Sequence, residues 1–169
     1  FKGITIYGKD LQKEKTFLPA TGKSNNITRI IPYSSSTMIF SAFGDNIYYI
    51  DVNAFRTRVL DPKFSNKFRN VINIKRVLGN RIVLGTYGDG LMIYSPVSRS
   101  MKVFDYANGL RSNDILGIEE DRSGNLWVSS SFGLYRINLS NNKIRSYFTA
   151  DGTAGDQYHE KSECMTAEC

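Results

Sequence analysis

One pair of residues, an aromatic side chain followed by glycine, recurs along this chain at nearly constant spacing. The pair stands at Phe43-Gly44, Tyr87-Gly88 and Phe132-Gly133, so that successive glycines lie 44 and 45 residues apart. A period of about 40–45 residues is typical of chains that repeat a four-stranded β-sheet unit. Chance rarely reproduces one interval twice, so this repeat restricts the fold more strongly than any other feature of the sequence.

The same order of segments surrounds each pair: two apolar segments joined by a polar turn, the aromatic-glycine turn, and two further strand-like segments. The clearest copy contains ILGIEE, LWVSS, LYRIN and KIRSYF. Its inner segment Leu126-Trp127-Val128, like Ile82-Val83-Leu84 in the previous copy, is continuously apolar, as expected for a strand covered on both faces. We therefore predict an all-β fold of β-propeller blades, each a four-stranded antiparallel meander.

Both ends of the chain fit the same register. Gly3 to Tyr7 matches Gly90 to Tyr94, and the step from Gly152 to Tyr158 repeats the step from Gly109 to Ile115. Propellers close with roughly four to eight blades, so we predict one segment, 1–169, that is a partial propeller of about 3.5 blades from a larger protein. Its parts are the end of a blade at 1–18, blades at 24–61, 69–105 and 112–149, and the start of a further blade at 156–169.

The formal net charge of +6 would suit a protein that binds nucleic acid. The cationic residues are scattered singly, however, and alternate with apolar residues in Arg56-Thr57-Arg58-Val59 and Met101-Lys102-Val103-Phe104. Such alternation is typical of the solvated face of an outer strand. We predict no nucleic acid contact by this segment. The chain also lacks a run of about 18 apolar residues, so we expect no transmembrane helix in it.

The residues needed for catalysis do not converge in this sequence. His159 is the single histidine, and no Gly-x-Ser-x-Gly motif accompanies it. The acidic run Glu119-Glu120-Asp121 could serve glycoside cleavage or bind calcium, but its place beside an Asp-x-x-Gly-Asn turn favours a structural role. The segment GTYGDG lacks the ending of a phosphate-binding loop. We predict no catalytic residue, no metal ligand and no cofactor.

Cys164 and Cys169 form no zinc-ligand spacing and are too few for a disulfide framework. They fit either a disulfide in an oxidising compartment or two free thiols near the end of the chain.

Residues 108 to 138 resemble the two-component regulator propeller repeat. The matching residues are Gly109, Leu110, Ser112, Asn113, Ile115, Asp121, Gly124, Asn125, Leu126, Trp127, Gly133 and Leu134. The other two copies lack the Gly-Asn-Leu-Trp string and share only the Gly79-Asn80 turn and the Gly90-Leu91 strand start with this pattern.

The resemblance implies the periplasmic sensor region of a hybrid two-component histidine kinase. In that family the repeats build paired propellers, followed by an immunoglobulin-like domain, a membrane helix and a kinase. It further implies that the segment senses oligosaccharides. The bound state would then regulate the transcription of genes for polysaccharide use. The implied partners are an oligosaccharide ligand and the remaining propeller and immunoglobulin-like domains of the parent chain. We also expect the isolated segment to form a homodimer, because exposed strand edges favour association.

A ligand-binding surface is predicted at the aromatic-glycine turns, which open on the same face of a propeller as the loops that lead into each blade. Flat rings and polar groups gather there and suit a carbohydrate. The candidate residues are Phe43, Asp45, Tyr87, Asp89, Arg111, Asn113 and Phe132. The alternative is that these rings pack against the next blade. Trp127, in the middle of an apolar strand, is expected in the core between blades rather than in a ligand site.

Two functions of different classes follow. The first is a non-catalytic sensor segment whose ligand shifts the populations of two receptor states. The second is a structural or protein-binding propeller with no small ligand. An enzyme such as a propeller lyase or glycosidase is a third, less favoured possibility.

Overall fold

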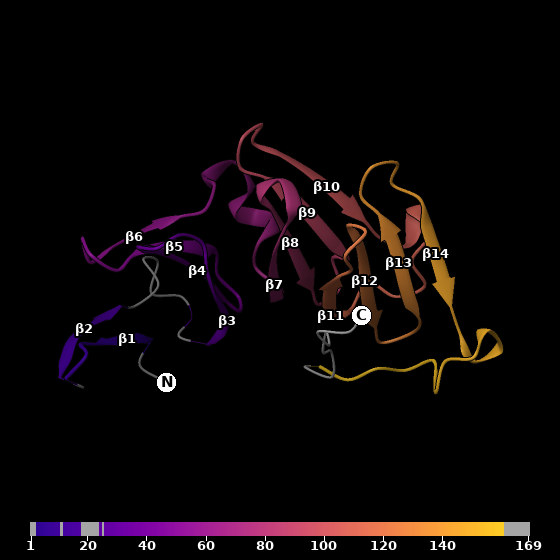
Figure 1. Ribbon diagram of the computed structural model, residues 1–169, viewed down its shortest axis with the longest axis horizontal. Helices are drawn as coiled ribbons and strands as arrows, with labels where there is room; N and C mark the ends of the chain where they lie inside the picture. Colours follow the sequence, from indigo (N-terminus) through magenta and orange to yellow (C-terminus); the bar gives the residue numbers. More distant parts are fainter. Residues whose placement is uncertain (1–2, 11, 18–23, 25, 161–169) are drawn as a thin grey trace. The chain divides into compact units, whose positions relative to one another are not determined.

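The computed structural model describes residues 3–10, 12–17, 24 and 26–160, and this part of the chain is almost entirely β-structure (Figure 1). The early strands are β1 (Ile4–Tyr7), β2 (Lys13–Phe17), β3 (Ile27–Pro32), β4 (Thr37–Ala42), β5 (Ile47–Asp51) and β6 (Arg56–Val59). The later strands are β7 (Val71–Val77), β8 (Arg81–Thr86), β9 (Leu91–Ser95), β10 (Ser100–Phe104), β11 (Ile115–Glu120), β12 (Asn125–Ser130), β13 (Leu134–Asn138) and β14 (Ile144–Tyr147). Short 3-10 helices connect some of them: η1 (Pro62–Lys67), η2 (Leu78–Asn80), η3 (Tyr106–Asn108) and η4 (Thr149–Asp151).

The strands form three four-stranded sheets and a two-stranded hairpin. The sheets have the orders β3-β4-β5-β6, β7-β8-β9-β10 and β11-β12-β13-β14, and β1 pairs with β2. Consecutive strands are neighbours in every sheet, and the pairs are antiparallel, so each sheet is a meander. The predicted all-β fold of propeller blades is confirmed, with three whole blades and one half blade in the described residues.

The chain divides into two compact units, Phe1–Val71 and Ile72–Cys169, which we call unit 1 and unit 2. In unit 1, both faces of the sheet β3 to β6 carry buried residues, with Phe40, Tyr48 and Ile50 on one face and Ile39, Ile47 and Tyr49 on the other. Phe40 of β4 lies opposite Tyr48 of β5, and their rings stack with centroids 5.1 Å apart. The hairpin contributes Phe17, and Ile4 and Ile6 pack against the same cluster. The hairpin β1–β2 thus packs on the face of the sheet that carries Phe40 and Tyr48.

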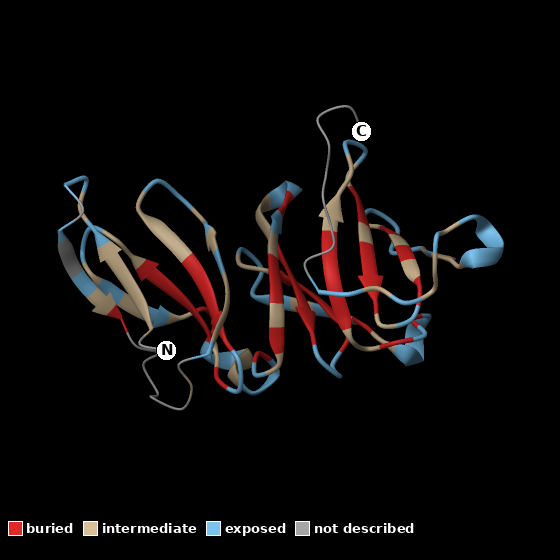
Figure 2. Ribbon diagram, turned by 90° about the horizontal axis from the view of Figure 1, so that it is seen from below, coloured by how far each residue is buried: buried red, intermediate tan, exposed pale blue. Residues whose placement is uncertain are grey.

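Unit 2 contains two blades that share one apolar core. The sheet β7 to β10 supplies Val77, Val83, Leu91, Ile93 and Phe104, and the sheet β11 to β14 supplies Ile118, Leu126, Val128, Tyr135 and Ile137. In Figure 2 these buried residues form the red bands along the strands, whereas most turns are pale blue. Burying this apolar surface is the main free energy that holds the two blades together.

The two blades approach each other closely at Gly85 of β8. A Cβ atom on Gly85 would lie 3.0 Å from both the side chain and the carbonyl oxygen of Ile115, so even alanine would fit there only if Ile115 shifted. Polar contacts flank this point, because Lys75 of β7 forms an ion pair with Glu119 of β11 and the Leu78 backbone N–H donates to the Glu120 carboxylate. The register of the two blades is therefore fixed by packing and by charge.

The predicted start of a further blade at 156–169 is described only in part. Residues 156–160 are not paired in a strand, and His159 is exposed in this segment. Residues 161–169, with Cys164 and Cys169, lie outside the described residues.

Candidate functional site

The aromatic-glycine turn of unit 1 connects β4 and β5. Its Phe43 ring is 36% exposed, and Gly44 adopts a φ of 79°, a left-handed conformation that favours glycine. The Gly44 N–H donates to the carbonyl oxygen of Arg69, 2.7 Å away, in the segment that leads into β7. Asp45 is only 2% exposed, so its carboxylate lies beneath the turn and not at the surface. Of the two candidate side chains of this turn, Phe43 is thus the one that is exposed.

The equivalent turns of unit 2 each carry an exposed ring, and both turns are hydrogen-bonded to one connecting loop, residues 109–114, which leads into β11. Tyr87 is 43% exposed and Phe132 is 38% exposed. The Gly88 N–H donates to Oδ1 of Asp114, and the Gly90 N–H donates to the carbonyl oxygen of Asn113. From the other turn, the Ser131 N–H donates to the carbonyl oxygen of Asp114. The connecting loop is therefore held between two aromatic turns.

Arg111 and Phe132 are joined through Phe148, a residue that the sequence analysis did not select. The Arg111 guanidinium lies 4.8 Å from the centre of the Phe148 ring, and this ring packs against Phe132 with centroids 5.6 Å apart. Tyr135 adds a second link, since its hydroxyl accepts the Arg111 N–H and donates to the Phe132 carbonyl oxygen. The repeat offered a signal for Phe148, which stands 44 residues after Phe104 at the end of the blade's last strand.

The polar candidates of unit 2 differ in how far they are exposed. Asp89 and Arg111 are exposed, whereas Asn113 is half-buried and its Oδ1 accepts the backbone N–H of Tyr106 at 3.0 Å. Asn113 thus holds the turn η3 in place. The structure brings Tyr87, Asp89, Arg111, Asn113 and Phe132 together around the connecting loop of unit 2. Phe43 and Asp45 belong to unit 1.

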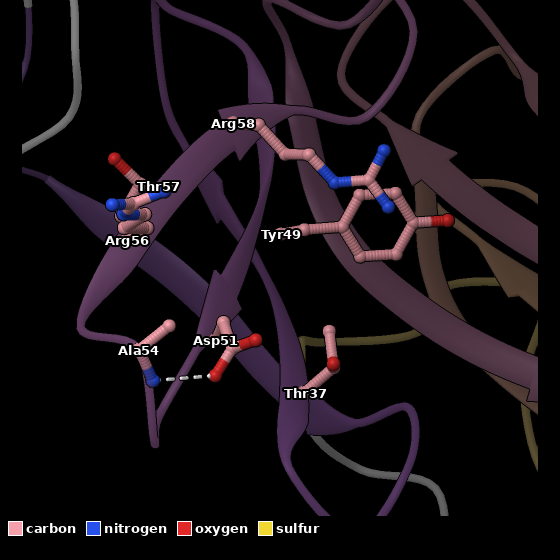
Figure 3. A pocket seen from close by; sticks show the side chains of 7 residues that line it. All are labelled: Thr37, Tyr49, Asp51, Ala54, Arg56, Thr57 and Arg58. Carbon is pink, nitrogen blue, oxygen red and sulfur yellow. Dashed lines mark hydrogen bonds between the residues drawn. The ribbon is translucent and has the colours of Figure 1, made fainter.

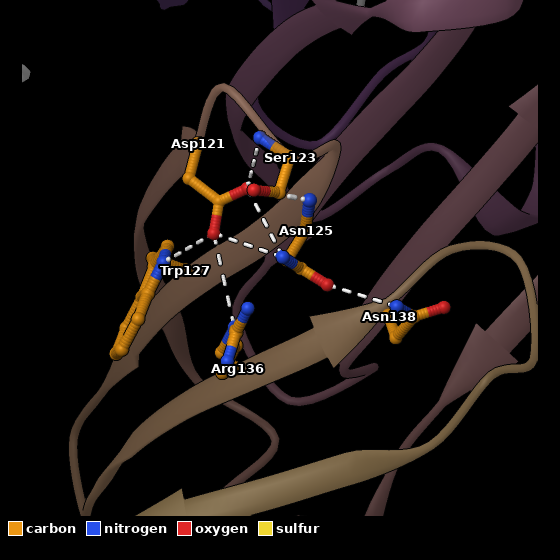
Figure 4. Close-up of polar contacts among 6 residues, drawn as sticks. All are labelled: Asp121, Ser123, Asn125, Trp127, Arg136 and Asn138. Carbon is orange, nitrogen blue, oxygen red and sulfur yellow. Dashed lines mark hydrogen bonds and ion pairs between the residues drawn. The ribbon is translucent and has the colours of Figure 1, made fainter. Parts of the chain in front are cut away.

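The acidic run 119–121 has the structural role that its turn predicts. Asp121 Oδ1 accepts the backbone N–H groups of Ser123 and Asn125, each at 2.9 Å, and thereby closes the turn between β11 and β12 (Figure 4). The side chain of Asn125 donates to both carboxylate oxygens, and Nε1 of Trp127 donates to Oδ2 at 3.0 Å. One carboxylate therefore links the Asp, Asn and Trp residues of the motif.

These contacts also change the acidity of Asp121. Burial alone would raise the pKa of this carboxyl, but the hydrogen bonds from Asn125, Trp127 and Ser123 outweigh that effect and hold the pKa below its usual value. Arg136 Nε lies 3.7 Å from Oδ2 and adds a positive charge on the same side. Asp121 is thus an ionised carboxylate whose oxygens are used in the hydrogen bonds of the turn.

Trp127 was expected in the core between blades, and this prediction is wrong. It is half-buried and lies on the face of β12 opposite Leu126 and Val128, which belong to the core. Its ring stacks on Tyr147 of β14 with centroids 5.4 Å apart. Strand alternation explains the difference, since a residue between two core residues points to the other face of the sheet.

No group of three or more His, Cys, Asp and Glu side chains that would suit a metal ion occurs among the described residues. No helix in the described ranges has the length and apolar character needed to cross a membrane.

Comparison with known proteins gives one sequence relative and several fold relatives. No family model matches the chain. A stretch of 55 residues, 32% of this chain and 4% of the other, is 36% identical to histidine kinase P4 of Formosa agariphila. The chain thus spans a small fraction of this relative.

The solved structures with a similar fold include extracellular domains assigned to hybrid two-component systems of B. thetaiotaomicron. One has a TM-score of 0.69 at 17% identity, with 86% of this chain and 22% of that chain covered. Another has a TM-score of 0.63 at 20% identity, with 85% and 19% covered. A virginiamycin B lyase from Staphylococcus aureus shares the fold at a TM-score of 0.66 and 14% identity, with 86% and 48% covered. The fold is therefore common to sensors and to an enzyme.

Because the sequence relative is a histidine kinase and the fold relatives include extracellular domains of two-component systems, these likenesses agree with the motif in residues 108 to 138. The chain is a run of β-propeller blades, and it resembles the two-component regulator propellers in sequence and in structure.

Proposed function

We propose that this chain is part of the extracytoplasmic, periplasmic sensor region of a hybrid two-component histidine kinase and that it binds an oligosaccharide without transforming it. The observation that carries the proposal is the shared fold with extracellular domains of two-component systems, together with the histidine kinase relative. Binding would regulate the transcription of genes for polysaccharide use.

The surface around the connecting loop of unit 2 supports a carbohydrate ligand. Tyr87 and Phe132 expose ring faces, which pack well against the apolar face of a sugar, and Asp89 and Arg111 offer an acceptor and donors for hydroxyl groups. Arg111 is held on the Phe148 ring and so loses little conformational freedom on binding. In unit 1, Phe43 presents the equivalent ring, while Asp45 is buried.

A ligand at this surface would act through the connecting loop. The Gly88 and Gly90 N–H groups and the Ser131 N–H all bind this loop, so a ligand that contacts both turns stabilises one arrangement of the two blades. A sensor responds when its ligand binds one of two states more tightly. The remaining propeller and immunoglobulin-like domains of the parent chain, or a second copy of the segment, would receive this shift.

Calorimetric titration of the 169-residue chain with a panel of oligosaccharides tests the proposal. We expect one saccharide class to bind, and Tyr87→Ala or Phe132→Ala to weaken its affinity about tenfold, because each removes a stacking ring. Tyr7→Ala is the matched control, since Tyr7 is also an exposed ring, at 58%, but lies in the hairpin of unit 1.

The same titration separates the alternatives. A chain that binds no saccharide would favour a structural or protein-binding propeller and would contradict the sensor proposal. Chromatography of the titrated samples shows whether the saccharide has been cleaved. Cleavage products would contradict the proposal that the chain binds its ligand without transforming it.

A further inference from the structure

A hollow of about 380 Å³ opens on the sheet β3 to β6, on residues that the sequence analysis treated as solvated surface (Figure 3). It is lined by Thr37, Tyr49, Asp51, Ala54, Arg56, Thr57 and Arg58. The side chains of Tyr49 and Asp51 alternate along β5 with Tyr48 and Ile50, so the hollow lies on the sheet face opposite the cluster of Phe40, Tyr48 and Ile50.

Arg58 is held in a fixed orientation in this hollow. Its guanidinium lies 4.5 Å from the centre of the Tyr49 ring, and Tyr33 packs edge-on against the same ring at 5.2 Å. Tyr49 is only 6% exposed and gives a rigid support. Stacking occupies the flat face of a guanidinium and leaves its in-plane N–H donors available, the arrangement that binds an oxyanion with two hydrogen bonds.

A second cation, Arg56, lies on the same face two residues before Arg58. Its register partner across the strands is Asp51, whose Oδ1 accepts the backbone N–H groups of Asn53 and Ala54 at 3.0 and 2.8 Å. The carboxylate of Asp51 is thus used to close the turn between β5 and β6. Within the described part of the chain, neither guanidinium forms an ion pair with a carboxylate.

We propose that this hollow binds a small oxyanion group, a carboxylate or a sulfate. Arg58 forms the bidentate contact and Arg56 supplies the second positive charge. Two cations against one carboxylate leave the hollow net positive, and its concave shape excludes part of the solvent that would screen an anion on open surface. This site lies in unit 1 and is independent of the saccharide surface proposed around Tyr87 and Phe132.

Titration of the ¹⁵N-labelled 169-residue chain at constant, low ionic strength tests the proposal, with the Nε–Hε signals of arginine as the readout. Sodium sulfate, galacturonate and the neutral sugar galactose are the three probes. We expect sulfate and galacturonate to shift the signals of Arg56 and Arg58 with a saturable curve, and galactose to leave them unchanged. Tighter binding of galacturonate than of sulfate would identify an acidic sugar as the source of the anion.

Substitutions distinguish a specific anion site from nonspecific attraction of anions by surface charge. Arg58→Gln should weaken binding about tenfold or more, Arg56→Gln should weaken it several-fold, and Asp51→Asn should strengthen it, because these changes remove two attractive charges and one repulsive charge. Arg145→Gln is the matched control, since Arg145 also stacks on a tyrosine, Tyr147 at 4.9 Å, on an outer strand.

Three outcomes would overturn the proposal: signals that do not saturate, galactose binding as well as galacturonate, or an equal loss of affinity in Arg145→Gln and Arg58→Gln. Circular dichroism checks that each variant is folded. Arg56 is exposed, so Arg56→Gln gives a result even where Arg58→Gln disturbs the Tyr49 stack.

Discussion

Asp121 shows how a single side chain sets the conformation of a turn in this repeat. Its carboxylate binds two backbone N–H groups, the Asn125 amide and the Trp127 indole, and Asn125 in turn accepts a hydrogen bond from Asn138 of the next strand (Figure 4). Gly124, at a φ of 74°, permits the tight bend that brings these donors together. The turn, and with it the β11–β12 register, depends on one ionised group.

Asp121→Asn should therefore destabilise the chain, by about 1–2 kcal/mol at neutral pH, because charged hydrogen bonds become neutral ones. Since the pKa of Asp121 is lowered in the folded state, its contribution is present above the unfolded pKa of about 3.9 and is lost as the pH falls through the folded pKa. Urea unfolding of the unsubstituted chain and of Asp121→Asn at a series of pH values measures the difference in their free energies of unfolding. A difference in stability that stays constant into strong acid would contradict it.

Trp127 contributes to stability mainly through contacts within its own blade. Trp127→Phe removes the Nε1–H donor to Asp121 but keeps a ring against Tyr147, and we expect a cost of about 1 kcal/mol. Trp127→Ala also removes the ring, and should cost about 2–3 kcal/mol, less than a fully buried tryptophan. Urea unfolding followed by circular dichroism gives both values. A double-mutant cycle with Asp121→Asn should show coupling, and additive effects would exclude the Asp121 contact as the cause.

At the scale of elements, the turn between β8 and β9 shows why two nearby glycines are not equivalent. Both have positive φ, 84° at Gly88 and 80° at Gly90. A Cβ atom on Gly88 would meet nothing within 4 Å, whereas one on Gly90 would overlap the Phe104 carbonyl oxygen at the end of β10. Gly90 is thus required by the close approach of β10 to the turn as well as by its backbone conformation.

Gly88→Ala should cost about 1 kcal/mol for the left-handed backbone alone, and Gly90→Ala about 3 kcal/mol or more, because the overlap adds to the same strain. Chemical denaturation of the two variants side by side measures the difference. Equal costs would mean that the β10 end moves away easily and does not restrict this turn.

At the scale of the whole molecule, the chain contains two units, and each has an apolar cluster of its own. The unit 1 core is built on Phe40 and Tyr48, and the unit 2 core spans its two blades. The chain has one tryptophan, Trp127, which lies in unit 2. Its fluorescence therefore reports on unit 2, whereas circular dichroism reports on all strands.

We expect the two signals to follow different unfolding curves in urea, with part of the circular dichroism lost before the fluorescence changes, since the apolar cluster around Phe40 and Tyr48 has fewer buried residues than the cluster of unit 2. Phe40→Ala, at a residue only 1% exposed, should shift the early phase and leave the fluorescence midpoint in place. Coincident curves, or a Phe40→Ala shift of both, would show one cooperative transition.

The sequence by itself determined the blades, their strand windows and the turns at Gly44, Gly88 and Gly133, because these follow from local chemistry. Alternation of apolar residues, left-handed glycine and the capping carboxylate of Asp121 act over a few neighbouring residues. Only the tertiary structure decided that Trp127 lies outside the core, that Asp45 is buried while Asp89 is exposed, and that Arg58 stacks on Tyr49. These outcomes depend on which face of a sheet another segment covers and on which residues pair across strands. Contacts between residues far apart in the chain determine both features.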